Sequence, residues 1–236
     1  MNKSTEPRIN VVSSTTAAET RKLADLAVDP ILQVGSRVEV VDRGPLAWRN
    51  LLKGRDYTGM DIAQGENVDV VADLCAPFAE LDNKLGGRRF GFIICQHVLE
   101  HVVDPFQAAR NLTSLTRPGG YCYVAVPWVQ SYHGYPHDHW RFSFSGLKIL
   151  FPDLSVEDMY WSSSGAGFDA AYKVLIDGKI DLNRTPLEIE SKLFEISFNR
   201  DDSINLLKRQ PDQPKLPMSR RYLPVIFVNL LLRRCE

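Results

Sequence analysis

The chain has 236 residues, with 28 basic and 29 acidic side chains and a net charge of −1 at pH 7. This length suits one α/β domain with an elaboration rather than two full domains, and the balanced charge gives no reason to expect a nucleic-acid or anionic-membrane partner. The four cysteines lack Cys-x-x-Cys spacing and the N-terminal residues lack a secretory apolar core, so we expect a reducing, cytoplasmic context.

The first half of the chain predicts alternating helices and strands. Helical spacing is present over residues 17–27, and a strand is predicted over 37–41, followed by the turn DRGP and a helix near 46–52. A second strand over 56–62 ends at Asp61, a third over 68–74 ends near Asp73, and 77–85 predicts a helix. Strand, glycine turn and helix together are typical of the entry to a nucleotide site.

The most informative stretch is FGFIICQHVLEH, residues 90–101. Its apolar run predicts a strand buried on both faces, which ends in polar Gln96 and His97. Next come a helix over 105–115, the turn RPGG, a strand over 121–129, a helix over 145–151 and a strand over 155–162. The last strand is predicted over 223–232, in a segment too short to span a bilayer.

These elements predict one α/β domain with a mostly parallel sheet. We divide it into a tail and helix (1–32), a core (33–164), an insertion or elaboration (165–221) and a final core strand (222–236). Within the insertion, 186–194 predicts a helix and the proline-bearing 209–217 an extended loop.

Asp61 and Asp73 each follow a strand, where a carboxylate can accept hydrogen bonds from a ribose diol or an adenine amine. Acids at strand ends also cap the following helix, so each one alone is a weak signal. As a pair on successive strands they favour a nucleotide-type ligand.

Residues 97–101, HVLEH, match a zinc-peptidase pattern that requires a helix through both histidines. A strand that runs directly into His97 argues against that function. A helix starting just after the strand would still bring His97, Glu100 and His101 onto one face. We assign no metal ligands, and we keep metal-assisted chemistry through these three residues as an alternative.

The loop SYHGYPHDHWRFS carries His133, His137, Asp138, His139 and Arg141. A histidine suits general-base work, and an aspartate or arginine can orient it or bind a polar substrate. The alternative is a solvated loop whose histidines only form hydrogen bonds.

Taken in order, these segments resemble the class I S-adenosylmethionine-dependent methyltransferases, in particular the small type 11 branch. The matching residues are YTGMDI (57–62), VVADL (70–74), QHVLEHV (96–102), Asp104 and Pro105, PGG (118–120), Val126 and Pro127, and the loop YHGYPHDHWRF (132–142). The resemblance implies an α/β, Rossmann-like seven-stranded methyltransferase sheet, mostly parallel with an antiparallel last strand and with helices on both faces.

The resemblance also implies roles for single residues. Gly44 belongs to the glycine loop, Asp61 to the ribose contact, Asp73 to the adenine contact, and Gln96 and His97 to the floor under the methionine part. Ile62 and Leu74 adjoin the two acids, and Leu74 would flank the adenine ring. The family's first motif is an acid, then glycine, any residue, glycine. Aligned through the following WRNLL segment, its acid position holds Val40 and its first glycine position holds Asp42. Asp42 could supply the missing carboxylate from its neighbouring position.

We therefore expect methyl transfer from S-adenosyl-L-methionine to an oxygen or nitrogen of a small polar acceptor, such as a saccharide or cell-surface precursor. His133 or His137 would be the base, with His97 third, and Asp138 and Arg141 would orient or bind the acceptor. The alternative is a methyltransferase-like binding or scaffold protein with a weakened cofactor site. The oligomeric state is left open.

Overall fold

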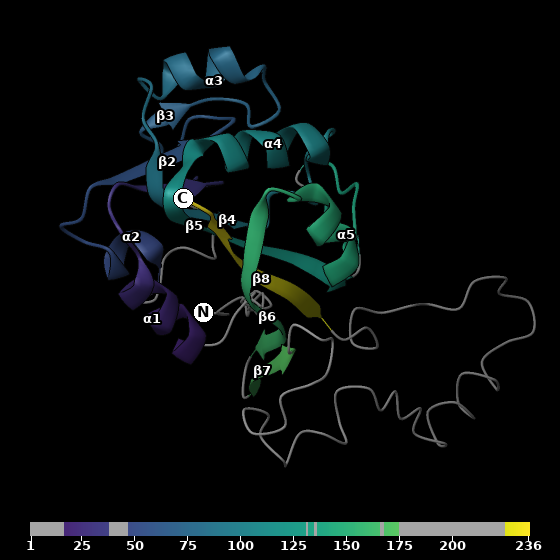
Figure 1. The fold of residues 1–236 in the computed structure, drawn as a ribbon. Coiled ribbons are helices and arrows are strands. Elements are labelled where there is room, and N and C mark those ends of the chain that lie inside the picture. The colour runs from purple at the N-terminus through teal and green to yellow at the C-terminus, as the bar shows by residue number, and fades with distance from the viewer. Residues whose placement is uncertain (1–16, 38–46, 131, 135, 166–167, 175–224) are drawn as a thin grey trace, which may run out of the picture.

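The structure is a computed structural model that describes residues 17–37, 47–130, 132–134, 136–165, 168–174 and 225–236 (Figure 1). Its helices and strands are, in chain order, α1 Ala17–Leu26, β1 Ile31–Val34, α2 Trp48–Leu51, β2 Tyr57–Asp61, β3 Val70–Val71, α3 Phe78–Lys84, β4 Phe90–Gln96, α4 Pro105–Leu115, β5 Thr116–Val129, α5 Phe144–Leu150, β6 Leu154–Gly165, β7 Phe168–Val174 and β8 Ile226–Arg234.

The strands form one sheet in the order β3-β2-β1-β4-β5-β8-β6-β7. The first five in this order are parallel, whereas β8 runs antiparallel to both of its neighbours, β5 and β6. This confirms the predicted Rossmann-like methyltransferase sheet with an antiparallel last strand. The strand β7, antiparallel to β6, adds an eighth strand at the edge.

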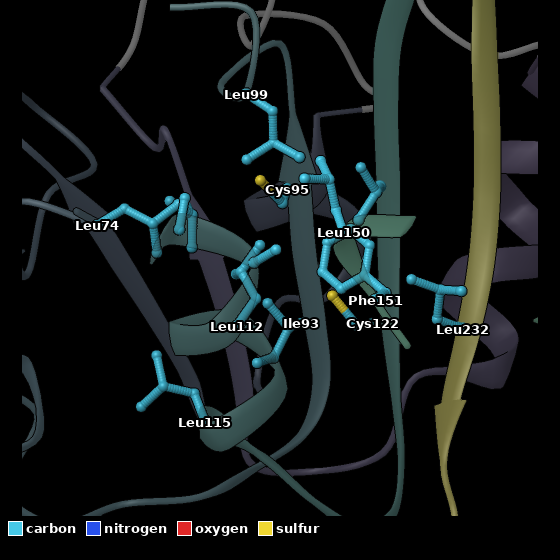
Figure 2. Close-up of a cluster of buried hydrophobic side chains, with 14 of the residues drawn as sticks. Leu74, Ile93, Cys95, Leu99, Leu112, Leu115, Cys122, Leu150, Phe151 and Leu232 are labelled. Carbon is cyan, nitrogen blue, oxygen red and sulfur yellow. The ribbon is translucent and has the colours of Figure 1, made fainter. Parts of the chain in front are cut away.

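Helices cover both faces of the sheet (Figure 1). Successive residues of β4 point to opposite faces, as the pleat requires: Ile93 packs in a core cluster with α3, α4 and α5, and Ile94 in a cluster with α1 and α2. Figure 2 shows part of the first cluster, in which Ile93, Leu112 and Leu115 lie close together. The doubly covered β4 explains why its sequence is a continuous apolar run.

The helix α4 has the bounds that its sequence predicts. The Asp104 side chain accepts a hydrogen bond from the Gln107 amide at 2.9 Å and caps the helix, while Pro105 occupies its first turn. The apolar side of α4, which includes Ala108, is fully buried against the sheet. The sequence signals at both the start and the buried face of this helix agree.

The prediction of the first strand was wrong. The strand is Ile31–Val34, hydrogen-bonded between β2 and β4, so that Leu32 lies opposite both Thr58 and Ile93. All four of its residues are buried. Arg37 lies outside any strand, and residues 38–41 as well as Asp42 and Gly44 of the predicted turn lie outside the described residues.

Other predicted elements differ at their ends or were not described. The third strand is only Val70–Val71, so Asp73 lies two residues beyond it, and β5 begins at Thr116 and includes the PGG turn. The predicted helix 186–194 and loop 209–217 fall outside the described residues. Among the helices that are described, none has the length and apolar character needed to cross a membrane.

Candidate active site

The carboxyl ends of β1, β2 and β4 meet at one edge of the sheet, and Gly35 lies at their centre. Its amide donates a hydrogen bond to the carbonyl oxygen of Met60 at 2.9 Å, and its φ is +74°. A β-carbon at this position would lie 2.5 Å from Cγ2 of Val98. Only glycine therefore allows the chain to leave β1 in this conformation between β2 and the turn after β4.

The carboxylate of Asp61 is held at the same edge by two backbone amides. Its Oδ2 accepts a hydrogen bond from the Arg37 amide at 3.2 Å, and its Oδ1 accepts one from the Ala63 amide at 3.1 Å. Each carboxylate oxygen can accept a further bond, so a diol facing Asp61 would find an oriented acceptor. The neighbouring Ile62 is 70% exposed, an unusual state for a large apolar side chain.

Asp73 is exposed, and its Oδ1 accepts a hydrogen bond from the Cys75 amide at 2.8 Å. The adjoining Leu74 turns its side chain into the core (Figure 2). The loop that carries both is fixed by Asn111 of α4, whose buried amide donates to the carbonyl oxygens of Leu74 and Ala76 at 2.7 and 2.8 Å. The sequence analysis did not identify Asn111. The only feature of the sequence that indicates its role is its position as a polar residue on the apolar face of the helix.

Gln96 and His97 lie where β4 ends. The Gln96 side chain accepts a hydrogen bond from the indole of Trp48, and its amide nitrogen lies 3.5 Å from the Tyr123 hydroxyl. That hydroxyl donates to Oδ1 of buried Asn229 at 2.7 Å, so a polar network that sequence reasoning also missed runs through the sheet. His97 has a φ of +54°, uncommon for a residue with a β-carbon, and its amide donates to the Ala125 carbonyl at 3.0 Å.

The segment after β4 is a turn, so the helix required by the peptidase pattern does not form. Leu99 packs into the core near Cys95 (Figure 2). Glu100 is fully buried, and its Oε1 lies 3.4 Å from Nδ1 of His97, 3.9 Å from Nε2 of His101 and 4.0 Å from Nε2 of His133. These three ring nitrogens face one carboxylate oxygen.

The described residues of the loop from 130 to 142 lie against this turn. The amides of His139 and Trp140 donate to the Glu100 carbonyl oxygen at 2.8 and 3.2 Å, and the Trp140 indole donates to the Val102 carbonyl at 2.8 Å. Three separate bonds thus hold the described part of the loop beside the end of β4.

Within the loop, Asp138 and Arg141 form a two-pronged ion pair, and the Asp138 side chain is only 1% exposed. The Arg141 hydrogen bonds hold the pKa of Asp138 down at about 2. Asp138 also accepts the His133 amide at 2.9 Å, and Nδ1 of His133 lies 3.2 Å from its Oδ2. Burial lowers the pKa of His133, an effect that the charges of Asp138 and Glu100 oppose.

The predicted site residues therefore fall into groups. Asp61, Gln96 and His97 lie at one edge of the sheet, His133 joins His97 at the Glu100 carboxylate, and Asp138 and Arg141 support His133. His137 is exposed; its carbonyl accepts from Nδ1 of His101 at 2.5 Å, and its ring lies near that of His139. Asp42 and Gly44 lie outside the described residues.

The fold and this edge agree with the comparison of the sequence with protein families. The model of a methyltransferase domain matches residues 29–170, more than half of the chain. The chain belongs to this family, within the class I S-adenosylmethionine-dependent methyltransferases, and is an enzyme of that class. No curated protein matches the sequence.

Solved structures share the general arrangement at low sequence identity. The N-methyltransferase NodS from Bradyrhizobium japonicum WM9, in complex with S-adenosyl-L-homocysteine, is 11% identical, with a TM-score of 0.48 over 93% of this chain and 85% of that one. The YcgJ protein from Bacillus subtilis is 12% identical, with a TM-score of 0.45 over 93% and 99% of the two chains.

Proposed function

We propose that the enzyme transfers the methyl group of S-adenosyl-L-methionine to an oxygen or nitrogen atom of a small polar acceptor. The observation that carries this proposal is the meeting of Gly35, Asp61 and His97 at one edge of the parallel strands, with the histidine-bearing loop beside it. Open α/β sheets bind ligands at that edge, where the strand order reverses. Membership of the methyltransferase family supports the choice of cofactor.

The residues at this edge fit the cofactor. We assign the ribose hydroxyls to the oriented carboxylate of Asp61, one face of the adenine ring to exposed Ile62, and the adenine amine to Asp73. Leu74 backs the adenine loop from the core, and Gln96 and His97 form the floor under the methionine part. The absence of a β-carbon at Gly35 lets Val98 pack against the backbone and so holds the turn after β1 beside this edge.

The position of β1 changes the account of the first motif. Two residues before Gly35, where the family has an acid, this chain has Gln33, which is 6% exposed and accepts a hydrogen bond from the Tyr57 hydroxyl. A neutral side-chain amide forms a weaker hydrogen bond with the charged amino group of a cofactor than a carboxylate does. Asp42 stays our proposed source of that carboxylate, and Gly44 our proposed glycine of the first loop.

The chain's own residues position the acceptor and accept the proton that it loses. A lone pair of the acceptor forms the new bond to the methyl carbon while the carbon–sulfur bond breaks and its electron pair goes to sulfur. Where the acceptor must lose a proton, we assign the base to His133 or His137, with His97 third. Asp138 and Arg141 hold His133 and the loop, and an acceptor would approach between this loop and the end of β4.

Calorimetric titration of the purified chain with S-adenosylmethionine and S-adenosylhomocysteine tests the proposal. We expect both to bind with one site per chain, and a panel of polar acceptors, saccharides included, then to yield S-adenosylhomocysteine. Binding of neither compound at millimolar concentration would contradict the proposal and favour the scaffold alternative.

A further inference from the structure

We propose that Glu100, His101 and His133 bind one divalent transition-metal ion, of the kind represented by Zn²⁺, between the turn after β4 and the loop 130–142. One ligand atom from each residue lies within 4.8 Å of the others. Two imidazoles and one carboxylate are a common set for zinc, whereas Mg²⁺ and Ca²⁺ prefer oxygen ligands alone. This inference does not depend on the proposed methyl transfer.

The distances suit an ion with small adjustments. The two histidine Nε2 atoms lie 3.9 and 4.0 Å from Oε1 of Glu100. With zinc–nitrogen bonds of about 2.0–2.1 Å, ligand atoms around a tetrahedral ion are separated by about 3.3 Å. The two imidazole rings lie edge to face with their centres 5.1 Å apart, so modest side-chain rotations would bring all three ligand atoms around a common centre.

The burial of Glu100 is the second observation. Its side chain is 0% exposed, and neither carboxylate oxygen has a hydrogen-bond partner among the residues that the structure describes. A buried carboxylate without such partners is costly, because it has lost water and gained nothing of equal strength. A bound cation would satisfy this carboxylate.

The contacts behind the two histidines orient them as metal ligands. Nδ1 of His101 lies 2.5 Å from the His137 carbonyl oxygen. A carbonyl oxygen can only accept a hydrogen bond, so Nδ1 carries the proton. In the neutral ring, Nε2 of His101 then has the lone pair that a metal ion needs. Nδ1 of His133 lies 3.2 Å from Oδ2 of Asp138; it makes no hydrogen bond in this geometry, but the nearby carboxylate favours a proton on Nδ1 and so the same tautomer. Histidine ligands of metals commonly have a carbonyl or carboxylate partner on their other nitrogen.

Three protein ligands leave a fourth position open. His97, whose Nδ1 lies 3.4 Å from the same carboxylate oxygen, connects the cluster with the end of β4. If the proposed function also holds, an acceptor hydroxyl bound to the ion would lose its proton more easily. His133 would then be a ligand, so the base would be His137 or His97 and not His133.

The test uses the full chain without a histidine tag, stripped with a chelator and then titrated with Zn²⁺, and with Co²⁺ for its ligand-dependent absorption. The variants are Glu100→Gln and His133→Asn, and the control is His139→Ala, which removes an exposed imidazole of the same loop. Circular dichroism and the melting temperature without metal report whether each variant folds. If Glu100→Gln does not fold, His133→Asn alone tests the loss of a ligand.

We expect one Zn²⁺ per chain for the wild type and His139→Ala, and at least a tenfold weaker affinity for both ligand variants. Zn²⁺ should raise the melting temperature of the wild type and not of Glu100→Gln. Absence of stoichiometric binding, or equal affinity in all four proteins, would overturn the site and leave protonated histidines as the partners of Glu100. Calorimetry with S-adenosylhomocysteine on the same samples reports separately on the proposed function.

Discussion

Gly35 packs against Val98 so closely that a β-carbon at position 35 would lie 2.5 Å from Cγ2 of Val98. The mutation Gly35→Ala must therefore displace the turn after β4 and also hold alanine at a positive φ. We expect a loss of about 2–5 kcal/mol in the free energy of unfolding, measured with urea, and weaker binding of S-adenosylhomocysteine.

Gly54 provides the matched control for this mutation. Its φ is +85°, but a β-carbon there would meet no atom within 4 Å. Gly54→Ala should therefore show only the backbone cost, about 1 kcal/mol, and normal binding. Equal losses for the two alanine variants would refute the close contact with Val98.

Asn111 is expected to hold the loop that carries Asp73. In Asn111→Leu the side-chain volume is nearly kept, but the carbonyl oxygens of Leu74 and Ala76 lose their donors. We expect a destabilisation of about 2–4 kcal/mol in urea unfolding, together with weaker cofactor binding because Asp73 is no longer fixed. Gln107→Ala, which removes the bond to Oδ1 of Asn111 and an exposed bond from Arg110 but leaves both bonds to the loop, should cost less than about 1 kcal/mol. A larger loss from Gln107→Ala than from Asn111→Leu would contradict this role.

The Asp138–Arg141 pair makes stability depend on pH in the acid range. Because hydrogen bonds from Arg141 hold the pKa of Asp138 at about 2 in the folded chain, below its ordinary value, the pair stabilises the fold above about pH 4. That contribution is lost as the pH falls from 4 towards 2. The charged or titratable groups beside Asp138 are Arg141 and His133, and Glu100 lies on the other side of His133.

The measurement compares the urea midpoints of the wild type and Asp138→Asn at pH values from 6 to 2. The gap between them should be widest at or above pH 5 and should close towards pH 2. The exposed Asp153→Asn serves as a control and should show a small gap at every pH. A gap for Asp138→Asn that keeps its size down to pH 2 would show that the ion pair does not stabilise the loop.

Local sequence signals predicted those elements whose causes are themselves local. The helix α4 is an example, because Asp104, Pro105 and the apolar spacing act within a few residues of one another. The strand β4 is another, since its apolar run reflects burial on both faces. By contrast, the first strand could not be placed from local composition, because VEVV (38–41) also has the composition of a strand. The strand is at Ile31–Val34, where it pairs with β2 and β4, and that pairing joins segments distant in the sequence.

The candidate site was predicted in its parts but not in its connections. Asp61 and His97 follow from the ends of their strands, whereas the approach of His133 to Glu100 joins residues far apart in the chain. Nor does sequence spacing show that Asn111 bonds the Asp73 loop or that Tyr123 bonds Asn229. These contacts arise from packing between elements, which local patterns do not encode.

The central claim is that S-adenosylmethionine binds across the ends of β1, β2 and β4 with its ribose at Asp61. Calorimetric comparison of S-adenosylhomocysteine binding by the wild type, Asp61→Ala and Asp56→Ala tests it most directly, since Asp56 precedes the opposite end of β2 and pairs with Arg88. Loss of charge-assisted bonds worth about 1.5–3 kcal/mol each should weaken binding by Asp61→Ala at least tenfold and leave Asp56→Ala unchanged. Equal affinity of all three proteins would contradict the claim.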